Sequence, residues 1–451
     1  MPICINIGLK NSEENLMKKV FVLMVLVFLL VMPVLVFAAG ESDEPETMGP
    51  VTVWSEINIK APQTNLDEDF AKAVVGIEDA LGTELIIVTT PYKEISAKVN
   101  LAVQAGGDVP DIAQLKVSKL AFHVDNGTLM DITDYVEASP WYDGMDKSAL
   151  DAGRGPDGRI YAVPFNTRST LTYSYTAAFP DGPPLTTDDV LAAGPELKAK
   201  GMFTITGKAS EQQGVQVWWW PLIRTFGGHF ADSDGKVAWA NDATVKAVEF
   251  TRELIAKGYA PEVILAPGFD DEIPFMNGDV GAFNAGSWSY VWLNPLTTPS
   301  GVKYDNKSAS VEEAIKAGDL VLSPHISAPG SKPVTPLDGI LWAIPVGSEN
   351  VKGAEAFINF MMQTKVNTDI AYAWGGVPTI EEGKNDPRYS DSVYWSKVTE
   401  FMSEYAEAME PVANYDEATL KFADIAIELI HNSDKDIMSV LKQAQDEINA
   451  E

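Results

Sequence analysis

Apolar and polar residues follow one another along this chain in a way that predicts strands and helices in succession. Two apolar runs, residues 51–54 and 85–88, are typical of strands, and the second is typical of a strand buried on both faces. Residues 93–105 carry apolar side chains at helical spacing before Gly106-Gly107 ends the helix, and residues 111–115 predict the next strand. A strand–helix–strand order predicts a parallel sheet covered by helices.

The middle and the end of the chain continue in the same manner. Residues 242–257 place apolar side chains on one face of a helix, with Asn241 as its N-cap and Gly258 as its stop. Short apolar runs at 280–283 and 340–344 predict two further strands. Helical spacing dominates from Ser392 onward. The expected fold class is therefore α/β, and the length predicts two domains.

The first 38 residues have the features of a secretion signal. Lys18 and Lys19 precede an almost unbroken apolar stretch at 20–37, and the small residues that end it predict cleavage after Ala38. Met17 is an alternative start of translation. Because the stretch approaches the ~20 residues that span a bilayer, an uncleaved anchor is the alternative reading. Residues 39–50 are acidic and contain two prolines, which predicts a disordered spacer.

Cysteine content and charge narrow the location and the partners. The only cysteine, Cys4, lies before the predicted cut, so we expect a mature chain without disulfides and without a lipid-bearing cysteine, located in a periplasm. The net charge of −31 argues against a nucleic-acid partner and against binding to anionic lipid. It also disfavours anionic ligands, although the same acidity is explained by solubility alone.

Catalytic motifs are absent from the sequence. It has no Gly-x-Ser-x-Gly, no phosphate-binding loop and no His-Glu-x-x-His, and its 4 histidines are far apart. We therefore expect no catalytic residue, no metal and no cofactor. A glycosidase that uses two carboxylates stays an alternative, and residues 270–272 (Asp-Asp-Glu) are the candidate source of these carboxylates. We interpret that cluster as a solvated acidic face.

The chain is rich in tryptophan. There are 11 tryptophans, and three of them are consecutive, Trp218-Trp219-Trp220. An indole offers a large flat apolar face and one N–H donor, which suits a sugar ring with its C–H face and hydroxyl rim. Burial in a core is the competing interpretation, because large aromatic side chains are mostly buried for packing.

Other candidate ligand-binding residues follow the ends of predicted strands, or lie next to a glycine turn. Ligands of open α/β sheets bind beyond the carboxyl ends of the strands. Surface ion pairs and helix caps are the competing roles for the charged ones. The predicted ligand-binding residues are Trp54, Glu56, Lys116, Asn166, Arg168, Trp218, Trp219, Trp288, Asp338 and Trp374.

Several segments together resemble the extracellular solute-binding proteins of ABC importers, family 1, the maltose-binding type. The similar segments occur in the family's order and cover nearly all of the mature chain. They are residues 105–112 (Ala-Gly-Gly-Asp-Val-Pro-Asp-Ile), 158–164 (Gly-Arg-Ile-Tyr-Ala-Val-Pro), 220–228 with Trp-Pro-Leu-Ile and Gly-Gly, 275–283 (Phe-Met-Asn-Gly-Asp-Val-Gly-Ala-Phe) and 344–360.

The resemblance implies a two-lobed periplasmic binding protein type II fold. Each lobe would be a mostly parallel sheet flanked by helices, with a hinge crossed near Asn166, Ser323 and Gln363. The N-terminal lobe would comprise 51–166 plus 323–362, and the C-terminal lobe 167–322 plus 363–451. Trp218, Trp219 and Trp288 would stack on the ligand from the second lobe. Trp54, Glu56, Lys116 and Asp338 would contact it from the first.

By the same resemblance the protein is a non-enzymatic periplasmic receptor that closes on a neutral mono- or oligosaccharide. Its partners would be this carbohydrate and the membrane permease subunits of an importer, and it would act as a monomer without stable membrane insertion. Residues 171–175 (Leu-Thr-Tyr-Ser-Tyr) depart from the family pattern, where Tyr-Tyr-Asn-Lys is frequent. The alternatives are the same fold binding a peptide, polyamine or other small solute, a secreted glycosidase, and a receptor that presents its ligand to a membrane sensor.

Overall fold

The computed structural model describes residues 49–412 and 414–450. The predicted signal peptide, its cleavage after Ala38 and nearly all of the acidic spacer lie outside the described residues. Within the described residues, none of the helices combines the length and the apolar composition that crossing a bilayer requires.

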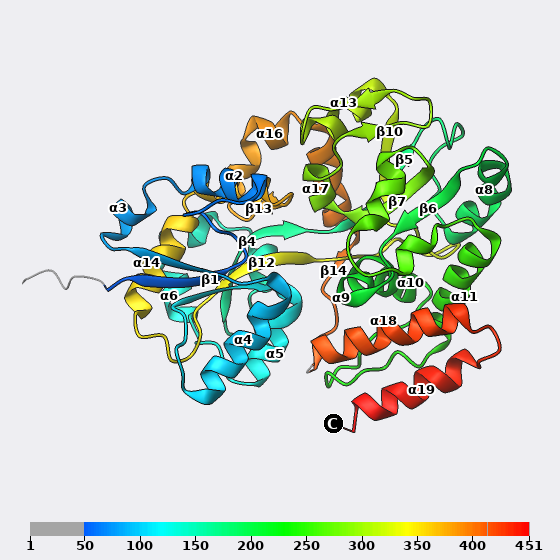
Figure 1. Ribbon diagram of the computed structural model, residues 1–451. Coiled ribbons are helices and arrows are strands. Elements are labelled where there is room, and N and C mark those ends of the chain that lie inside the picture. The colour runs from blue at the N-terminus through cyan, green and yellow to red at the C-terminus, as the bar shows by residue number, and fades with distance from the viewer. Residues whose placement is uncertain (1–48, 413, 451) are drawn as a thin grey trace, which may run out of the picture. The chain divides into compact units, whose positions relative to one another are not determined.

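The first body of the molecule is built on a six-stranded sheet in the order β13-β4-β12-β3-β1-β2 (Figure 1). Strand β1 runs parallel to β2 and β3, whereas β12 runs antiparallel to β3 and β4, and β13 antiparallel to β4. The prediction of a mostly parallel sheet is therefore correct only for its N-terminal strands. The strands are β1 (Val51–Ser55), β2 (Leu85–Thr89), β3 (Ile112–Lys116), β4 (Ala162–Arg168), β12 (Asp338–Ala343) and β13 (Val377–Pro378).

Helices cover both faces of this sheet because their apolar faces pack onto its buried strands. Helix α2 begins at a capping box in which Thr64 and Asp67 satisfy each other's backbone N–H groups. Helix α4 ends at Gly106, whose left-handed φ of 61° a glycine adopts without strain. The helices of the first body are α2 (Asn65–Ala73), α3 (Ile77–Leu81), α4 (Tyr92–Ala105), η1 (Val117–Lys119), α5 (Leu120–Asp125), α6 (Thr133–Ala138), η2 (Tyr142–Gly144), α7 (Lys147–Asp151), α14 (Val351–Met361) and α15 (Thr364–Ala373).

The second body contains a four-stranded sheet in the order β10-β5-β7-β6. Only β6 and β7 pair in parallel; β5 is antiparallel to both of its neighbours. Buried tyrosines of β5 pack under the sheet, and the Tyr173 hydroxyl lies 2.7 Å from that of Tyr394. The strands are β5 (Thr170–Tyr175), β6 (Phe203–Gly207), β7 (Val280–Gly286) and β10 (Leu320–Pro324), with the short pairs β8 (Leu296–Thr297) and β9 (Lys303–Tyr304), and β11 (Thr335–Pro336) and β14 (Ala406–Glu407).

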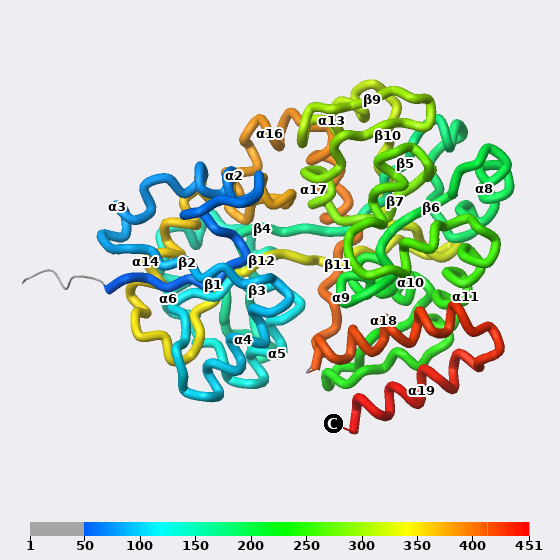
Figure 2. The backbone as a smooth tube through the Cα atoms, in the orientation of Figure 1, coloured from blue at the N-terminus to red at the C-terminus, as the bar shows by residue number. Residues whose placement is uncertain are grey.

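Helices surround the second sheet, and α18 and α19 lie side by side at the C-terminal end, where both pack on α11 (Figures 1 and 2). Helix α11 spans the predicted residues, with Asn241 accepting from the Thr244 N–H and Gly258 in the left-handed conformation. The helices are α8 (Thr187–Ala199), α9 (Glu211–Gly214), the π-helical turn η3 (Val215–Trp219), α10 (Trp220–Thr225), α11 (Asp242–Lys257), η4 (Glu262–Leu265), η5 (Asp270–Glu272), α12 (Ile273–Met276), η6 (Ser287–Val291), α13 (Ala309–Ala317), α16 (Pro387–Ser390), α17 (Val393–Tyr405), α18 (Tyr415–His431) and α19 (Ile437–Ile448). The turn η7 (Glu381–Asn385) packs instead on β13 and α15 of the first body.

The chain passes between the two bodies three times. The first passage joins β4 directly to β5 at residues 168–170, and the second follows β10 and leads through β11 to β12. Thr335 in the second passage ties the two together, because its hydroxyl accepts from the Thr170 N–H and donates to the Thr170 carbonyl, both at 2.8 Å.

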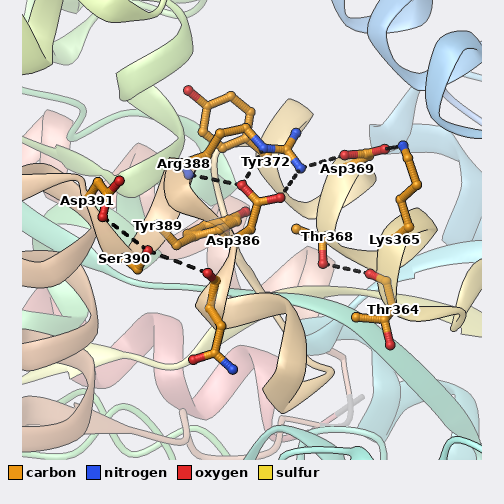
Figure 3. Close-up of polar contacts among 12 residues, drawn as sticks. Thr364, Lys365, Thr368, Asp369, Tyr372, Asp386, Arg388, Tyr389, Ser390 and Asp391 are labelled. Atoms are coloured by element: carbon orange, nitrogen blue, oxygen red, sulfur yellow. Dashed lines mark hydrogen bonds and ion pairs between the residues drawn. The ribbon is translucent and has the colours of Figure 1, made fainter.

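The third passage comes later than the predicted position near Gln363. Helix α15 still belongs to the first body, where Val366 and Ile370 are buried in its core, and β13 still pairs with β4. The crossing follows η7, which still packs on β13 and α15. Arg388 of α16 braces this region by donating to Asp369 of α15 at 2.6 Å and to Asp386 at 2.9 Å (Figure 3).

Candidate functional site

A cavity of ≈ 510 Å³ lies between the carboxyl ends of strands from both sheets. Glu56 follows β1, Lys116 ends β3 and Arg168 ends β4, so the first body contributes charged groups. A smaller cavity of ≈ 170 Å³ adjoins it and shares part of its wall. The residues that line both cavities are Glu56, Tyr92, Lys116, Gln213 and Gln216.

Two half-buried charges of the first body face this space. Glu56 accepts a hydrogen bond of 3.1 Å from the Gln114 amide, and burial raises the pKa of its carboxyl, while Lys116 and Arg168 act in the opposite direction. The Lys116 ammonium lies 4.1 Å from the centre of the Tyr92 ring, and burial lowers its pKa. Both groups lose hydration, which strengthens any polar contact that a ligand makes with them.

Arg168 is held rigidly at the base of the cavity. Its Nη2 donates to Asp338 Oδ2 at 2.5 Å, and the two side chains are only 5% and 2% exposed. The guanidinium lies 4.7 Å from the Trp288 ring and 5.8 Å from the Trp374 ring, so two indoles flank it. Its Nε has no hydrogen-bond partner among the described residues. An oriented, unpaired donor therefore lies beside two aromatic faces.

The second body supplies aromatic surface. Trp288 lies in η6, directly after β7, and Gly375 lets the two segments approach closely. A Cβ on Gly375 would lie 2.5 Å from the Trp288 Cα, and its φ of 62° also favours glycine. Phe269 and Trp292 line the same cavity and are 53% and 45% exposed, which is high for such large apolar side chains.

Half of the predicted ligand-binding residues reach the cavity. They come from five separate segments that only the fold brings together, and ligand contact by each of them stays a prediction. The five that line it are Glu56, Lys116, Arg168, Trp288 and Trp374.

The prediction that Trp218 and Trp219 stack on a ligand is wrong for this arrangement of the chain. Both side chains are 0% exposed. The Trp218 indole N–H donates to the Thr251 hydroxyl at 3.0 Å, and the Trp219 N–H donates to the Ala209 carbonyl at 2.7 Å. The indole N–H of each ring is therefore paired inside the protein, and its apolar faces are covered by other side chains. The preceding residues Gln216 and Val217 of the same π-helical turn line the cavity instead.

Three further predicted residues also have internal roles. Trp54 is 8% exposed and lies under the Lys98 ammonium at 4.2 Å. Asn166 accepts from the Ile340 N–H at 3.0 Å, where the pairing of β4 with β12 shifts register. Asp338 compensates the charge of Arg168. These residues sit near the strand ends, as expected, but none of the three lines the cavity.

The interpretation of residues 270–272 as a solvated acidic face is wrong for Asp271 and Glu272, because both line the cavity. The turn η5 directs both side chains to the cavity wall, while Asp270 stays exposed. Burial raises the pKa of Asp271 to about 6 and that of Glu272 to about 7. No local sequence signal separates a turn that presents acids to a cavity from one that presents them to solvent. Other cavity residues that the sequence did not indicate include Tyr92, Gln213, Gln216, Phe269, Asn284 and Trp292.

Metal chemistry has no support among the described residues, where no three His, Cys, Asp or Glu side chains converge as ligands.

Ion pairs join the two bodies beside the smaller cavity. Lys93 of α4 pairs with Glu211 of α9 at 2.6 Å. Lys119 of η1 pairs with Asp416 of α18 and donates to Gln212 at 3.3 Å. These contacts connect opposite walls of the site, so they stabilise the arrangement in which both walls face one ligand.

Removing both pairs should weaken ligand binding moderately. The double variant Lys93→Gln/Asp416→Asn is expected to bind about 3- to 10-fold more weakly, because partly exposed ion pairs contribute about 0.2–1 kcal/mol each. Calorimetry at low and high salt measures this, and the wild-type affinity should fall with salt more than that of the variant. Lys72→Gln/Asp69→Asn removes a pair within α2 and should leave affinity unchanged. Equal affinities of wild type and double variant at low salt would contradict the expectation.

Two α/β bodies joined by three passages, with a cavity lined from both, define a two-lobed binding protein. The model of the family described as bacterial extracellular solute-binding protein matches residues 66–395 of this chain. The protein belongs to this family.

Solved structures of low sequence identity share the fold. The GacH receptor of Streptomyces glaucescens, studied with acarbose, has a TM-score of 0.73 at 17% identity and covers 89% of this chain and 98% of its own. Maltose-bound MalE3 of T. maritima has a TM-score of 0.72 at 20% identity, over 89% and 99%. A solute-binding protein of Thermotoga lettingae, bound with α-D-tagatose, has a TM-score of 0.71 at 18% identity, over 89% and 98%.

One curated relative matches over a shorter length. It is named as a probable amino-acid ABC transporter periplasmic-binding protein of Sinorhizobium fredii, 24% identical over 187 residues. The match spans 40% of this chain and 43% of the relative.

Proposed function

We propose that this protein is the periplasmic substrate-binding component of an ABC importer and that it binds a mono- or oligosaccharide in the larger cavity. The observation that carries the proposal is the combination of aromatic faces with unpaired donors. Trp288, Trp292 and Trp374 offer flat apolar surface. The donors without partners on the same wall are Arg168 Nε, Asn284 Nδ2 and Trp374 Nε1.

This combination suits a sugar because hydroxyl oxygens accept from the donors while the C–H face of the ring lies on an indole. A buried donor without a partner costs about 1–3 kcal/mol, so a ligand that pairs with it is strongly favoured over one that does not. The acarbose, maltose and tagatose named for the three structural relatives support the same ligand class.

The mechanism we propose is closure of the two bodies around the ligand. A ligand shifts the equilibrium toward the closed state only by its differential affinity for that state. A ligand held by Glu56 and Lys116 on one side and by Trp288 on the other satisfies this condition, because it needs both walls at once. Permease subunits would recognise the closed form.

The remaining parts of the proposal follow from the sequence. The chain would be exported with cleavage near Ala38, would carry no lipid, and would act as a monomer in the periplasm. We propose no enzymatic activity, cofactor or metal.

Trp288→Ala tests the site directly. It is expected to lower the affinity for the bound sugar about 30-fold or more, since a central aromatic contact contributes about 2 kcal/mol or more. Calorimetry of the wild type against mono- and oligosaccharides, amino acids and small peptides identifies the ligand. Calorimetry of Trp288→Ala with that ligand then measures the loss of affinity. Binding of amino acids or peptides, with no detectable binding of any sugar, would refute the proposed function.

A further inference from the structure

We infer that the larger cavity contains a subsite for a protonated amine, formed by the carboxyl groups of Asp271 and Glu272, and that the ligand is a sugar bearing such an amine. The amine subsite depends only on the charges and hydrogen bonds of the cavity wall. The statement that the amine belongs to a sugar rests on the proposed function.

The charges along the cavity wall leave these two carboxyls unmatched. Arg168 is neutralised by Asp338. Lys208 donates to the Gly268 carbonyl and pairs at 2.9 Å with Glu211, a carboxylate that it shares with Lys93. Lys116 lies against the Tyr92 ring.

Asp67, another acid of the wall, accepts from the backbone N–H groups of Asn58, Gln63 and Thr64. Asp271 and Glu272, by contrast, receive no ion pair and no side-chain hydrogen bond from any other residue in the described part of the chain.

An independent feature of the same wall points to a ligand with acceptor atoms. Asn284 is 0% exposed, and its Oδ1 accepts from the Thr172 hydroxyl at 2.6 Å. That hydrogen bond fixes the amide, whose Nδ2 has no partner although Asn284 lines the cavity. Buried donors are almost always paired in proteins, so this one marks the position of a ligand oxygen. A ligand with hydroxyls for Asn284 and a cation for the acids is an amino sugar.

The surroundings of the acids strengthen their interaction with a cation. Burial raises the pKa of Asp271 to about 6, against the opposing charge of Lys208, and the pKa of Glu272 to about 7. An ammonium group beside Asp271 and Glu272 would favour the ionised forms of both carboxyls. The low dielectric of a closed cavity would make the attraction between ammonium and carboxylate larger than in water. The exposed rings of Phe269 and Trp292 on the same wall offer π faces to the same cation.

The test compares amino sugars with their N-acetylated forms, in which the nitrogen carries an acetyl group and no charge. Calorimetry on the full mature chain measures affinity for glucosamine, galactosamine and their β-1,4-linked oligomers, and for the N-acetylated form of each. Spermidine is titrated as an amine without a sugar. We expect each amine that binds to do so at least 10-fold more tightly than its N-acetylated counterpart.

Isosteric variants assign the effect to the two acids. Asp271→Asn and Glu272→Gln should each lower the affinity for the amine at least 10-fold and change the affinity for the N-acetylated sugar less than 2-fold. Asp270→Asn is the matched control, because Asp270 is the exposed neighbour outside the cavity and its replacement should change neither affinity. Thermal unfolding verifies that all three variants are folded.

The pH profile supplies a readout that a merely structural role would not produce. Between pH 5 and pH 7 the affinity for the amine should rise, since Asp271 and Glu272 lose their protons in this range while the ligand keeps its own. The charged groups that act on Asp271 are Lys208, Asp270 and Glu211. In the double variant Asp271→Asn/Glu272→Gln this rise should be clearly smaller than in the wild type, because of the three carboxyls on the wall whose pKa burial raises only Glu56 remains.

The outcomes separate the two proposals. Equal affinity for amine and N-acetylated sugar, or unchanged amine affinity in both acid variants, overturns the amine subsite and leaves a sugar receptor. Binding of spermidine that depends on the two acids, without binding of any sugar, supports the subsite and overturns the sugar assignment. Binding of neither class overturns both.

Discussion

Replacing Trp219 by alanine is expected to lower the free energy of unfolding by about 3–5 kcal/mol while the folded molecule keeps its ligand affinity. The ring is 0% exposed and packs edge-on against Phe422, with centroids 5.9 Å apart. Its removal also leaves the Ala209 carbonyl without its N–H donor. Urea unfolding measures the stability, and calorimetry below the unfolding transition measures the affinity.

Trp288→Ala is the matched control, because it removes the same side chain from the cavity wall. Its expected profile is the reverse, a large loss of affinity and a smaller loss of stability. A Trp219→Ala protein as stable as the wild type, with ligand binding abolished, would contradict the internal position of Trp219 and restore the interpretation of the tryptophan run as a stacking platform.

Asp338→Asn is expected to cost about 3–5 kcal/mol of folding free energy, because it leaves the guanidinium of Arg168 buried without its counter-charge. Asp338 is 2% exposed, so water cannot take over the role of the carboxylate. The position of Arg168 between two indoles depends on the same contact. Ligand affinity should therefore fall as well, although Asp338 does not line the cavity. Chemical unfolding and calorimetry on the same preparation measure both losses.

Glu400→Gln provides the comparison for the loss of an ion pair at the surface. Its pair with Lys397 joins side chains that are each 44% exposed, and its removal should change stability by less than about 1 kcal/mol. If Asp338→Asn is as mild as Glu400→Gln, then Arg168 is compensated by some other group, and the account of the cavity base given above is wrong.

The sequence predicts the fold class well because the information lies in local patterns. The helix at 242–257 begins and ends at the predicted residues, since Asn241 and Gly258 act on the backbone next to them. The predicted ends of the strands before Glu56 and Lys116 lie within one residue of the observed ends, and the ordered segments that resemble solute-binding proteins are confirmed by the family match over residues 66–395.

The prediction of the site is less accurate because it requires knowing which way side chains face. The three tryptophans at 218–220 offer the same chemistry to a ligand and to a core, and the π-helical turn that holds the first two is not visible as a pattern. Asp271 and Glu272 look like a solvated pair for the same reason. Helix α15 stays with the first sheet because Asn367 donates to the Phe165 carbonyl and accepts from Thr379, contacts between residues far apart in the chain.

By itself, the sequence determined that this is an α/β solute-binding protein, because periodicity, caps and ordered motifs are properties of neighbouring residues. Only the tertiary structure decided which aromatic rings face the cavity, which acids lie there without a counter-charge, and which charges neutralise each other inside the protein. Burial and pairing depend on segments that meet only after folding, so no local pattern specifies them.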